Sequence, residues 1–133
     1  MLSPFLKTIE LDFATISLYE DYVISTIKEG VLFDSEEQKI IYSIFNTYYP
    51  YRSFGYISNR KFDYTVNPSI YLKSTDFEHL VGMTVVCYSE SSFKIATFEK
   101  AFFNGPFNVF YKVGDCEKWI LNQISHYKEK AGL

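Results

Sequence analysis

Residues 52–71 read RSFGYISNRKFDYTVNPSIY and contain the strand-to-helix transition that decides the fold. The stretch opens with 54–57, a short apolar run typical of a buried strand. Polar, turn-prone residues follow at 58–61. Asn67 then precedes Pro68, a pairing of N-cap and first helical residue that favours a helix start. Open α/β sheets usually bind where a strand leads through a loop into a helix, so we predict an α/β fold with a contact surface here.

The first thirty residues predict three antiparallel strands. Residues 7–13 alternate, with Ile9, Leu11 and Phe13 on one side, as in a half-buried strand. The alternation resumes in shifted phase after Ala14, which indicates a turn or bulge at that point. A third β-rich run covers 22–27. The connections are too short for crossovers, so the strands should form an antiparallel meander.

The most regular helical pattern follows this meander. Asp34 or Ser35 can cap the helix, and Glu36 and Glu37 occupy the first turn, where the helix dipole favours negative charge. The helix should end before Pro50. Apolar residues at helical spacing predict its inward face: Ile40, Ile41, Ile44, Phe45 and Tyr48.

The second half of the chain repeats strand and helix signals. Residues 83–88, MTVVCY, predict a central strand covered on both faces. A capping cluster at 89–92 then opens a helix, which Asn104-Gly105-Pro106 should terminate. Its predicted inward stripe is Ile95, Phe98, Ala101 and Phe102. A last strand is predicted at 107–111, and a last helix begins at 114–115 with Cys116, Trp119, Ile120 and Ile124 at helical spacing.

These elements predict one α/β domain over residues 1–133. The expected order is β-β-β-α-β-α-β-α-β-α: an antiparallel meander followed by βα repeats, in a mixed sheet with about four helices packed on it. The edge of the N-terminal strands could pair in a homodimer.

Composition excludes several classes of function. Thirteen Lys and Arg against sixteen Asp and Glu give a net charge of −3, which argues against a nucleic-acid or anionic-membrane partner held by a basic field. No window approaches the roughly 20 apolar residues of a membrane span, and the N-terminus lacks the apolar run of a signal peptide. We therefore expect a cytoplasmic protein. The 13 Phe and 12 Tyr are spread along the chain, which favours core packing over base stacking.

Catalytic and metal-binding patterns are absent from the sequence. His79 and His126 have no neighbours at ligand spacing, so no metal or cofactor is predicted. No serine lies in a Gly-x-Ser-x-Gly elbow. Cys87 lies within an apolar run and Cys116 on an apolar helix stripe, so both should be buried and inert. These patterns predict a non-enzymatic protein.

The loop between 58 and 69 is the predicted contact surface. Ser69 falls in a helical first turn, where backbone N–H groups favour an anion, so it is a candidate phosphorylation site with Arg60 and Lys61 nearby. The alternative is that Ser58, Asn59 and Ser69 only satisfy turn and cap geometry. The predicted partner-docking residues are Tyr56, Ser58, Asn59, Arg60, Lys61, Asn67, Ser69 and Tyr71.

The segment FGYISNRKFDYTVNPSIY, together with GMTVVCYSESSFKIATFEKAFFNGPFNVFYKVGDCEKWI, resembles the SpoIIAA-like branch of the STAS domains, the anti-sigma-factor-antagonist fold. The resemblance covers about residues 6–125, and its best-matching pieces are YISNR, FEKAFF and the D-x-x-x-W-I helix. It implies a sheet with packed helices and a protein-binding, non-enzymatic role. In the antagonists of that family a kinase phosphorylates a serine in an Asp-Ser-Ser-Gly setting. Ser69 falls at that place, in the different context Asn67-Pro68-Ser69-Ile70.

Two functional hypotheses follow. The first is an interaction module, possibly anti-sigma-factor-antagonist-like, that docks an unidentified protein through the loop and helix start around residues 58–71. The second is a binder of a small apolar or lipid-like ligand in an aromatic-lined pocket between sheet and helices.

Overall fold

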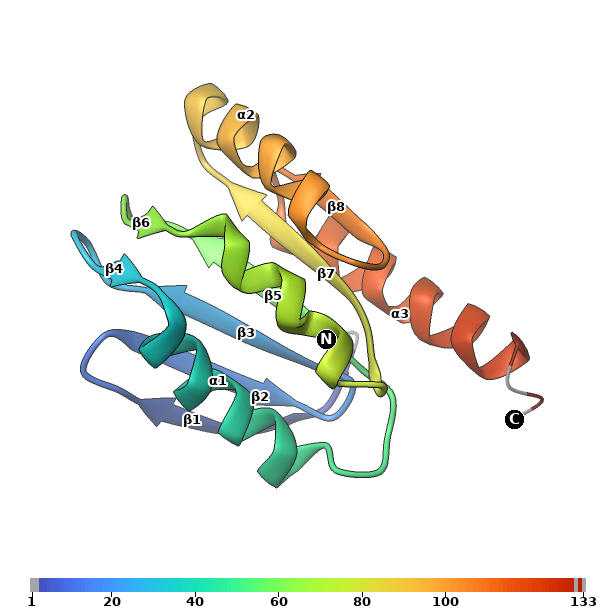
Figure 1. Cartoon of the computed structure of the whole chain (residues 1–133). Helices are drawn as coiled ribbons and strands as arrows, with labels where there is room; N and C mark the ends of the chain where they lie inside the picture. Colours follow the sequence, from blue (N-terminus) through green and yellow to red (C-terminus); the bar gives the residue numbers. More distant parts are fainter. Residues whose placement is uncertain (1–2, 131, 133) are drawn as a thin grey trace.

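The structure is a computed structural model that describes residues 3–130 and residue 132, with the backbone alone at 73–76. At its centre is a six-stranded sheet in the order β1-β2-β3-β5-β7-β8 (Figure 1). Its strands are β1 Phe5–Glu10, β2 Ala14–Tyr19, β3 Tyr22–Ile27, β5 Phe54–Arg60, β7 Leu80–Cys87 and β8 Phe107–Phe110. A separate parallel pair consists of β4 Leu32–Phe33 and β6 Thr65–Val66.

The predicted antiparallel meander is confirmed. β1 pairs with β2, and β2 with β3, both antiparallel. The expected turn lies at 11–14, where Leu11 and Ala14 exchange backbone hydrogen bonds of 2.8 and 3.4 Å. β1 forms one edge of the sheet and is largely exposed, so the edge that the predicted homodimer requires is present.

The predicted parallel half of the sheet is confirmed as well. β3, β5, β7 and β8 are successive parallel neighbours. The helices that connect or follow these strands are α1 Ser35–Tyr48, α2 Glu90–Glu99 and α3 Val113–Lys130, with two short 3-10 helices, η1 Pro68–Asp76 and η2 Lys100–Phe102.

The expectation of about four α-helices is wrong, because the described residues contain three. The segment predicted to begin a helix near Asn67 is instead the 3-10 helix η1. The sequence gives a physical reason, because the segment contains Ser, Thr and Asp, which have low helix propensity. The Gln38 side chain donates to the Ile70 carbonyl at 2.8 Å, which ties η1 to α1.

The α1 start follows the predicted pattern closely. Asp34 is the N-cap, and its carboxylate accepts from the Ser35 N–H at 2.8 Å. Glu37 reaches back to the Asp34 N–H at 3.0 Å, which completes a capping box. On the predicted inward face Ile41, Ile44 and Phe45 are buried, whereas Ile40 is exposed.

Helices cover both faces of the sheet, which explains why β5 and β7 are buried along nearly their whole length. α1, η1 and α2 contribute to one buried cluster, which includes Phe45, Ile70 and Ala96. α3 contributes to a second cluster through Cys116, Ile120 and Ile124, as the sequence predicts. In Figure 1, α3 lies behind the sheet and α1 and η1 lie in front of it.

The predicted inward stripe of the helix at 90–99 is wrong. The buried residues of α2 are Ala96 and Glu99. Ile95 and Phe98, expected inside, are 61% and 65% exposed. Compared with the predicted orientation, the helix is rotated about its own axis, because Glu99 faces the sheet and pairs with Arg60 on β5. This rotation places two large apolar side chains on the surface.

Candidate functional site

The structure buries half of the predicted docking residues. β5 continues through Arg60, three residues beyond the predicted apolar run 54–57, and a central strand is covered on both faces. Tyr56, Ser58 and Arg60 of this strand are buried, and so is Tyr71 of η1. They therefore lie beneath the surface rather than on it. The other four predicted residues, Asn59, Lys61, Asn67 and Ser69, are exposed or half-buried.

Arg60 forms a buried ion pair with Glu99 of α2. The two residues are 8% and 2% exposed. Both terminal nitrogens of Arg60 donate to the Glu99 carboxylate, with Nη2 at 2.7 Å from Oε1. The Tyr71 hydroxyl donates to the same Oε1 at 2.8 Å and accepts from Arg60 Nη2 at 3.1 Å. Arg60 Nε lies 3.5 Å from the Ser58 hydroxyl, which also contacts the Tyr64 hydroxyl at 3.1 Å.

This network has a fixed protonation state. Burial alone would lower the pKa of Arg60, yet Tyr64, Glu99 and Tyr71 around it raise that pKa above its ordinary value. Burial also raises the pKa of Tyr71, so its hydroxyl keeps the proton that it donates to Glu99. Paired with each other and bonded to Tyr71, the charges link β5, η1 and α2 and support the surface above them.

A trough opens above this support. It consists of two adjoining hollows of about 80 and 220 Å³ that share Arg60, Tyr64 and Ile95. We call it the trough and define it by its lining: Arg60, Phe62, Asp63, Tyr64, Val66, Pro68, Ser91, Ser92, Ile95, Phe98 and Glu99. It follows the carboxyl ends of β5 and β7, the end at which open α/β sheets usually bind their ligands. β6 and α2 lie at this same end of the sheet (Figure 1).

The two sides of the trough are built differently. One is a single face of α2, from Ser91 through Ile95 to Phe98 at helical spacing. The other is the extended segment 62–68, which contains β6. Ile95 and Phe98 are among the most exposed large apolar side chains, and Phe62 is 43% exposed. Clustered exposed apolar side chains of this kind mark interaction surfaces.

β6 has an unpaired backbone edge beside the trough. The ladder to β4 uses the N–H of Thr65 and the N–H of Asn67, which donate to Val31 and Phe33. Val66 lies between them, so its N–H and carbonyl point away from β4 in an extended strand. Within the described residues neither group has a hydrogen-bond partner. Val66 therefore presents one free donor and one free acceptor.

Ser69 lies at the start of η1, on the surface. The Asn67 side-chain oxygen accepts from the Ser69 N–H at 3.2 Å and from its hydroxyl at 2.8 Å. Asn67 therefore caps η1 as the sequence predicts. Arg60, which was expected to help hold a phosphate on Ser69, is committed to Glu99. Phosphorylation of Ser69 stays a prediction.

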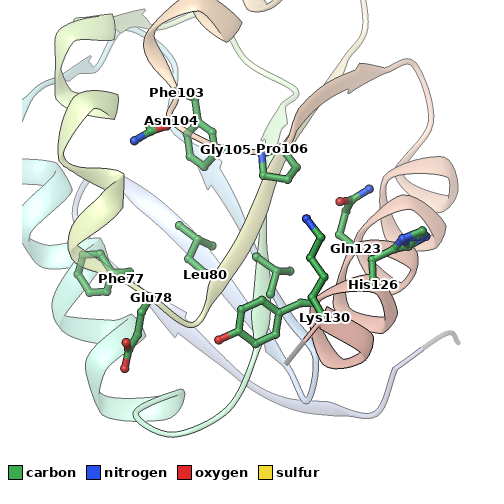
Figure 2. Close-up of a pocket in the computed structure, with 12 residues that line it drawn as sticks. Phe77, Glu78, Leu80, Phe103, Asn104, Gly105, Pro106, Gln123, His126 and Lys130 are labelled. Atoms are coloured by element: carbon green, nitrogen blue, oxygen red, sulfur yellow. The ribbon is translucent and has the colours of Figure 1, made fainter. Parts of the chain in front are cut away.

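A second hollow, of about 490 Å³, lies at the opposite end of β7 (Figure 2). The first residues of β7, the loop before β8 and the last turns of α3 line it. Its lining comprises Phe77, Glu78, Leu80, Val81, Phe103, Asn104, Gly105, Pro106, Gln123, His126, Tyr127 and Lys130. We call it the α3 hollow. Nothing in the sequence pattern predicts it, because its residues come from three distant segments.

The aromatic space between sheet and helices is nearly filled. Tyr42, Tyr56, Tyr71 and Phe103 are among its lining residues, and its free volume is about 10 Å³. Even one water needs roughly 10–15 Å³. In this conformation the space between sheet and helices leaves no room for the apolar ligand of the second hypothesis.

In the part of the chain that the structure describes, no group of three or more His, Cys, Asp and Glu side chains could hold a metal ion. Within the same residues no helix is both long and apolar enough to cross a membrane.

The two cysteines are expected to be unreactive in the folded protein. Both are fully buried, and burial raises the pKa of Cys87 and raises that of Cys116 to about 12. At about pH 8 a thiol of pKa 12 has a thiolate fraction of only about 10⁻⁴, and the thiolate is the nucleophile. Stopped-flow reaction with Ellman's reagent should be much slower without urea than in denaturing urea. Equal rates in both would contradict this assignment.

Comparison with known proteins gives no family. A scan against protein-family models found no match, and searches of curated proteins and of solved structures found no significant similarity. The resemblance to STAS domains therefore has no independent support beyond the α/β architecture.

Proposed function

We propose that this protein is a non-enzymatic, STAS-like interaction module of the cytoplasm that binds an extended segment of a partner protein in the trough. The observation that carries the proposal is the orientation of α2. It exposes Ile95 and Phe98 in the same hollow that Val66, with its free backbone edge, also lines. Strand addition uses two features that lie side by side here: exposed apolar side chains, and backbone N–H and carbonyl groups without partners.

The dimensions of the trough suit a short extended segment. The α2 face from Ser91 to Glu99 spans about 12 Å at 1.5 Å per residue. A strand rises about 3.3 Å per residue, so about four residues fit. The Val66 N–H and carbonyl would pair with one residue of the segment, and alternate apolar side chains would contact Ile95 and Phe98.

The buried ion pair supports this binding mode. Arg60 lines both hollows of the trough, and Glu99 fixes its position. Because the two charges pair with each other within the protein, neither requires an opposite charge from the partner. The partner segment is therefore expected to be apolar and uncharged at its centre, which deepens the docking hypothesis made from the loop alone.

Selection from a displayed library of random peptides tests the proposal. Selected peptides are expected to share alternating apolar residues. Each should lose binding to a variant that carries Ile95→Asp and Phe98→Asp, by about 2 kcal/mol or more for each anchor. Calorimetry measures the affinities.

The matched control is Ile40→Asp. Ile40 is an exposed apolar residue of α1 outside the trough, so its replacement should leave peptide affinity unchanged. Peptides without the alternating pattern, or an equal loss in both variants, would refute docking in the trough.

A further inference from the structure

The α3 hollow combines an apolar floor with polar groups that lack partners. Leu80 and Val81 of β7 and Pro106 before β8 contribute the apolar part. Its volume of about 490 Å³ lies within the range of small-molecule sites, roughly 300–1,000 Å³. The hollow is separate from the trough and shares no lining residue with it.

The polar groups come mainly from one face of α3. Gln123 and Lys130 line the hollow two turns apart. Figure 2 shows the Lys130 side chain running back from the last turn of α3 toward Pro106 and Gln123. Among the described residues neither the Gln123 amide nor the Lys130 ammonium has a hydrogen-bond or ion-pair partner.

Lys130 contributes a positive charge to the hollow, and Glu78 contributes a negative one on the opposite wall. The Glu78 side chain is 84% exposed and lies 3.5 Å from the neighbouring His79. No carboxylate of the described chain lies within 4 Å of the Lys130 ammonium. An anionic group beside Lys130 would therefore gain attraction without displacing an existing partner.

We propose that the α3 hollow binds a small amphipathic organic anion of the aryl or alkyl carboxylate class. The carboxylate lies beside the Lys130 ammonium, with the Gln123 amide as a second donor. The apolar body rests on Leu80, Val81 and Pro106, where its burial provides most of the affinity. This site is independent of the proposed docking in the trough, so an experiment can refute one of the two proposals and leave the other intact.

Titration with 2-naphthoate tests the proposal. Two-dimensional ¹H–¹⁵N NMR of the full chain should show saturable shifts at Gly105 and Gln123 and none at Val66. Lys130→Glu should weaken binding at least about tenfold, because attraction becomes repulsion. The neutral analogue 2-naphthamide should bind more weakly than 2-naphthoate to the unaltered protein.

The matched control is Lys128→Glu, which makes the same charge change in the same last turn of α3 at a residue that does not line the hollow. Its affinity for 2-naphthoate should stay close to that of the unaltered protein. No saturable shift at millimolar probe, an equal loss in both charge-reversal variants, or equal binding of the amide would each overturn the assignment. Because both lysines are exposed, both variants should fold, and the NMR spectra of the free variants check this directly.

Discussion

Replacement of Arg60 by methionine is expected to lower the free energy of unfolding by about 3–5 kcal/mol. The change leaves the Glu99 carboxylate buried, 2% exposed, with Tyr71 as its remaining donor among the described contacts. An uncompensated buried charge is far more costly than the loss of an ion pair at the surface. Urea unfolding followed by circular dichroism measures the loss.

The matched comparison is the double replacement Arg60→Met with Glu99→Met, which removes both charges. Because the desolvation of the pair is relieved, the double variant should be more stable than Arg60→Met alone. A loss below about 1 kcal/mol in Arg60→Met at neutral pH would show that the pair does not hold α2 in place.

Replacement of Gly55 by alanine is expected to lower the free energy of unfolding by about 3 kcal/mol, near the upper end for overpacking. Gly55 lies on the central strand β5, under α3. A Cβ at this position would lie 2.3 Å from Cγ2 and 2.5 Å from Cδ1 of Ile120. Ile120 is fully buried and cannot move aside, so β5 and α3 would have to separate. Thermal and urea unfolding measure the effect.

Two variants make this prediction specific. Ile120→Ala alone should cost about 2–5 kcal/mol because it leaves a cavity, yet together with Gly55→Ala the total should be smaller than the sum. Gly114→Ala is the control. A Cβ there meets nothing within 4 Å, and alanine favours a helix, so stability should stay the same or rise. Additive losses at positions 55 and 120 would contradict the close contact between β5 and α3.

Local signals predicted much of the fold. The alternation in β2, the continuous apolar run of β7 and the capping box at Asp34 each depend on residues close in sequence, and the structure has all three. The parallel half of the sheet followed from the alternation of strand and helix signals in the second half of the chain. In each case the sequence neighbourhood alone contains the physical cause.

The orientation of α2 could not be predicted in this way. Apolar spacing favoured Ile95 and Phe98 as its inward face, whereas Glu99 is buried because of Arg60, 39 residues away in the sequence. Charged residues are rarely buried unless paired, and that pair is visible only in the folded chain. The same error placed Arg60 on the surface. The α2 side of the trough was therefore missed, although the loop that forms its other side was identified.

The Val66 amide offers the most direct test of docking in the trough. Its rate of hydrogen exchange can be measured by NMR in the free protein and with a bound selected peptide. Strand addition predicts fast exchange in the free protein and exchange slowed by at least about tenfold in the complex, with the Thr65 amide, already bonded to Val31, protected in both. An unchanged Val66 rate in a saturated complex would contradict the account.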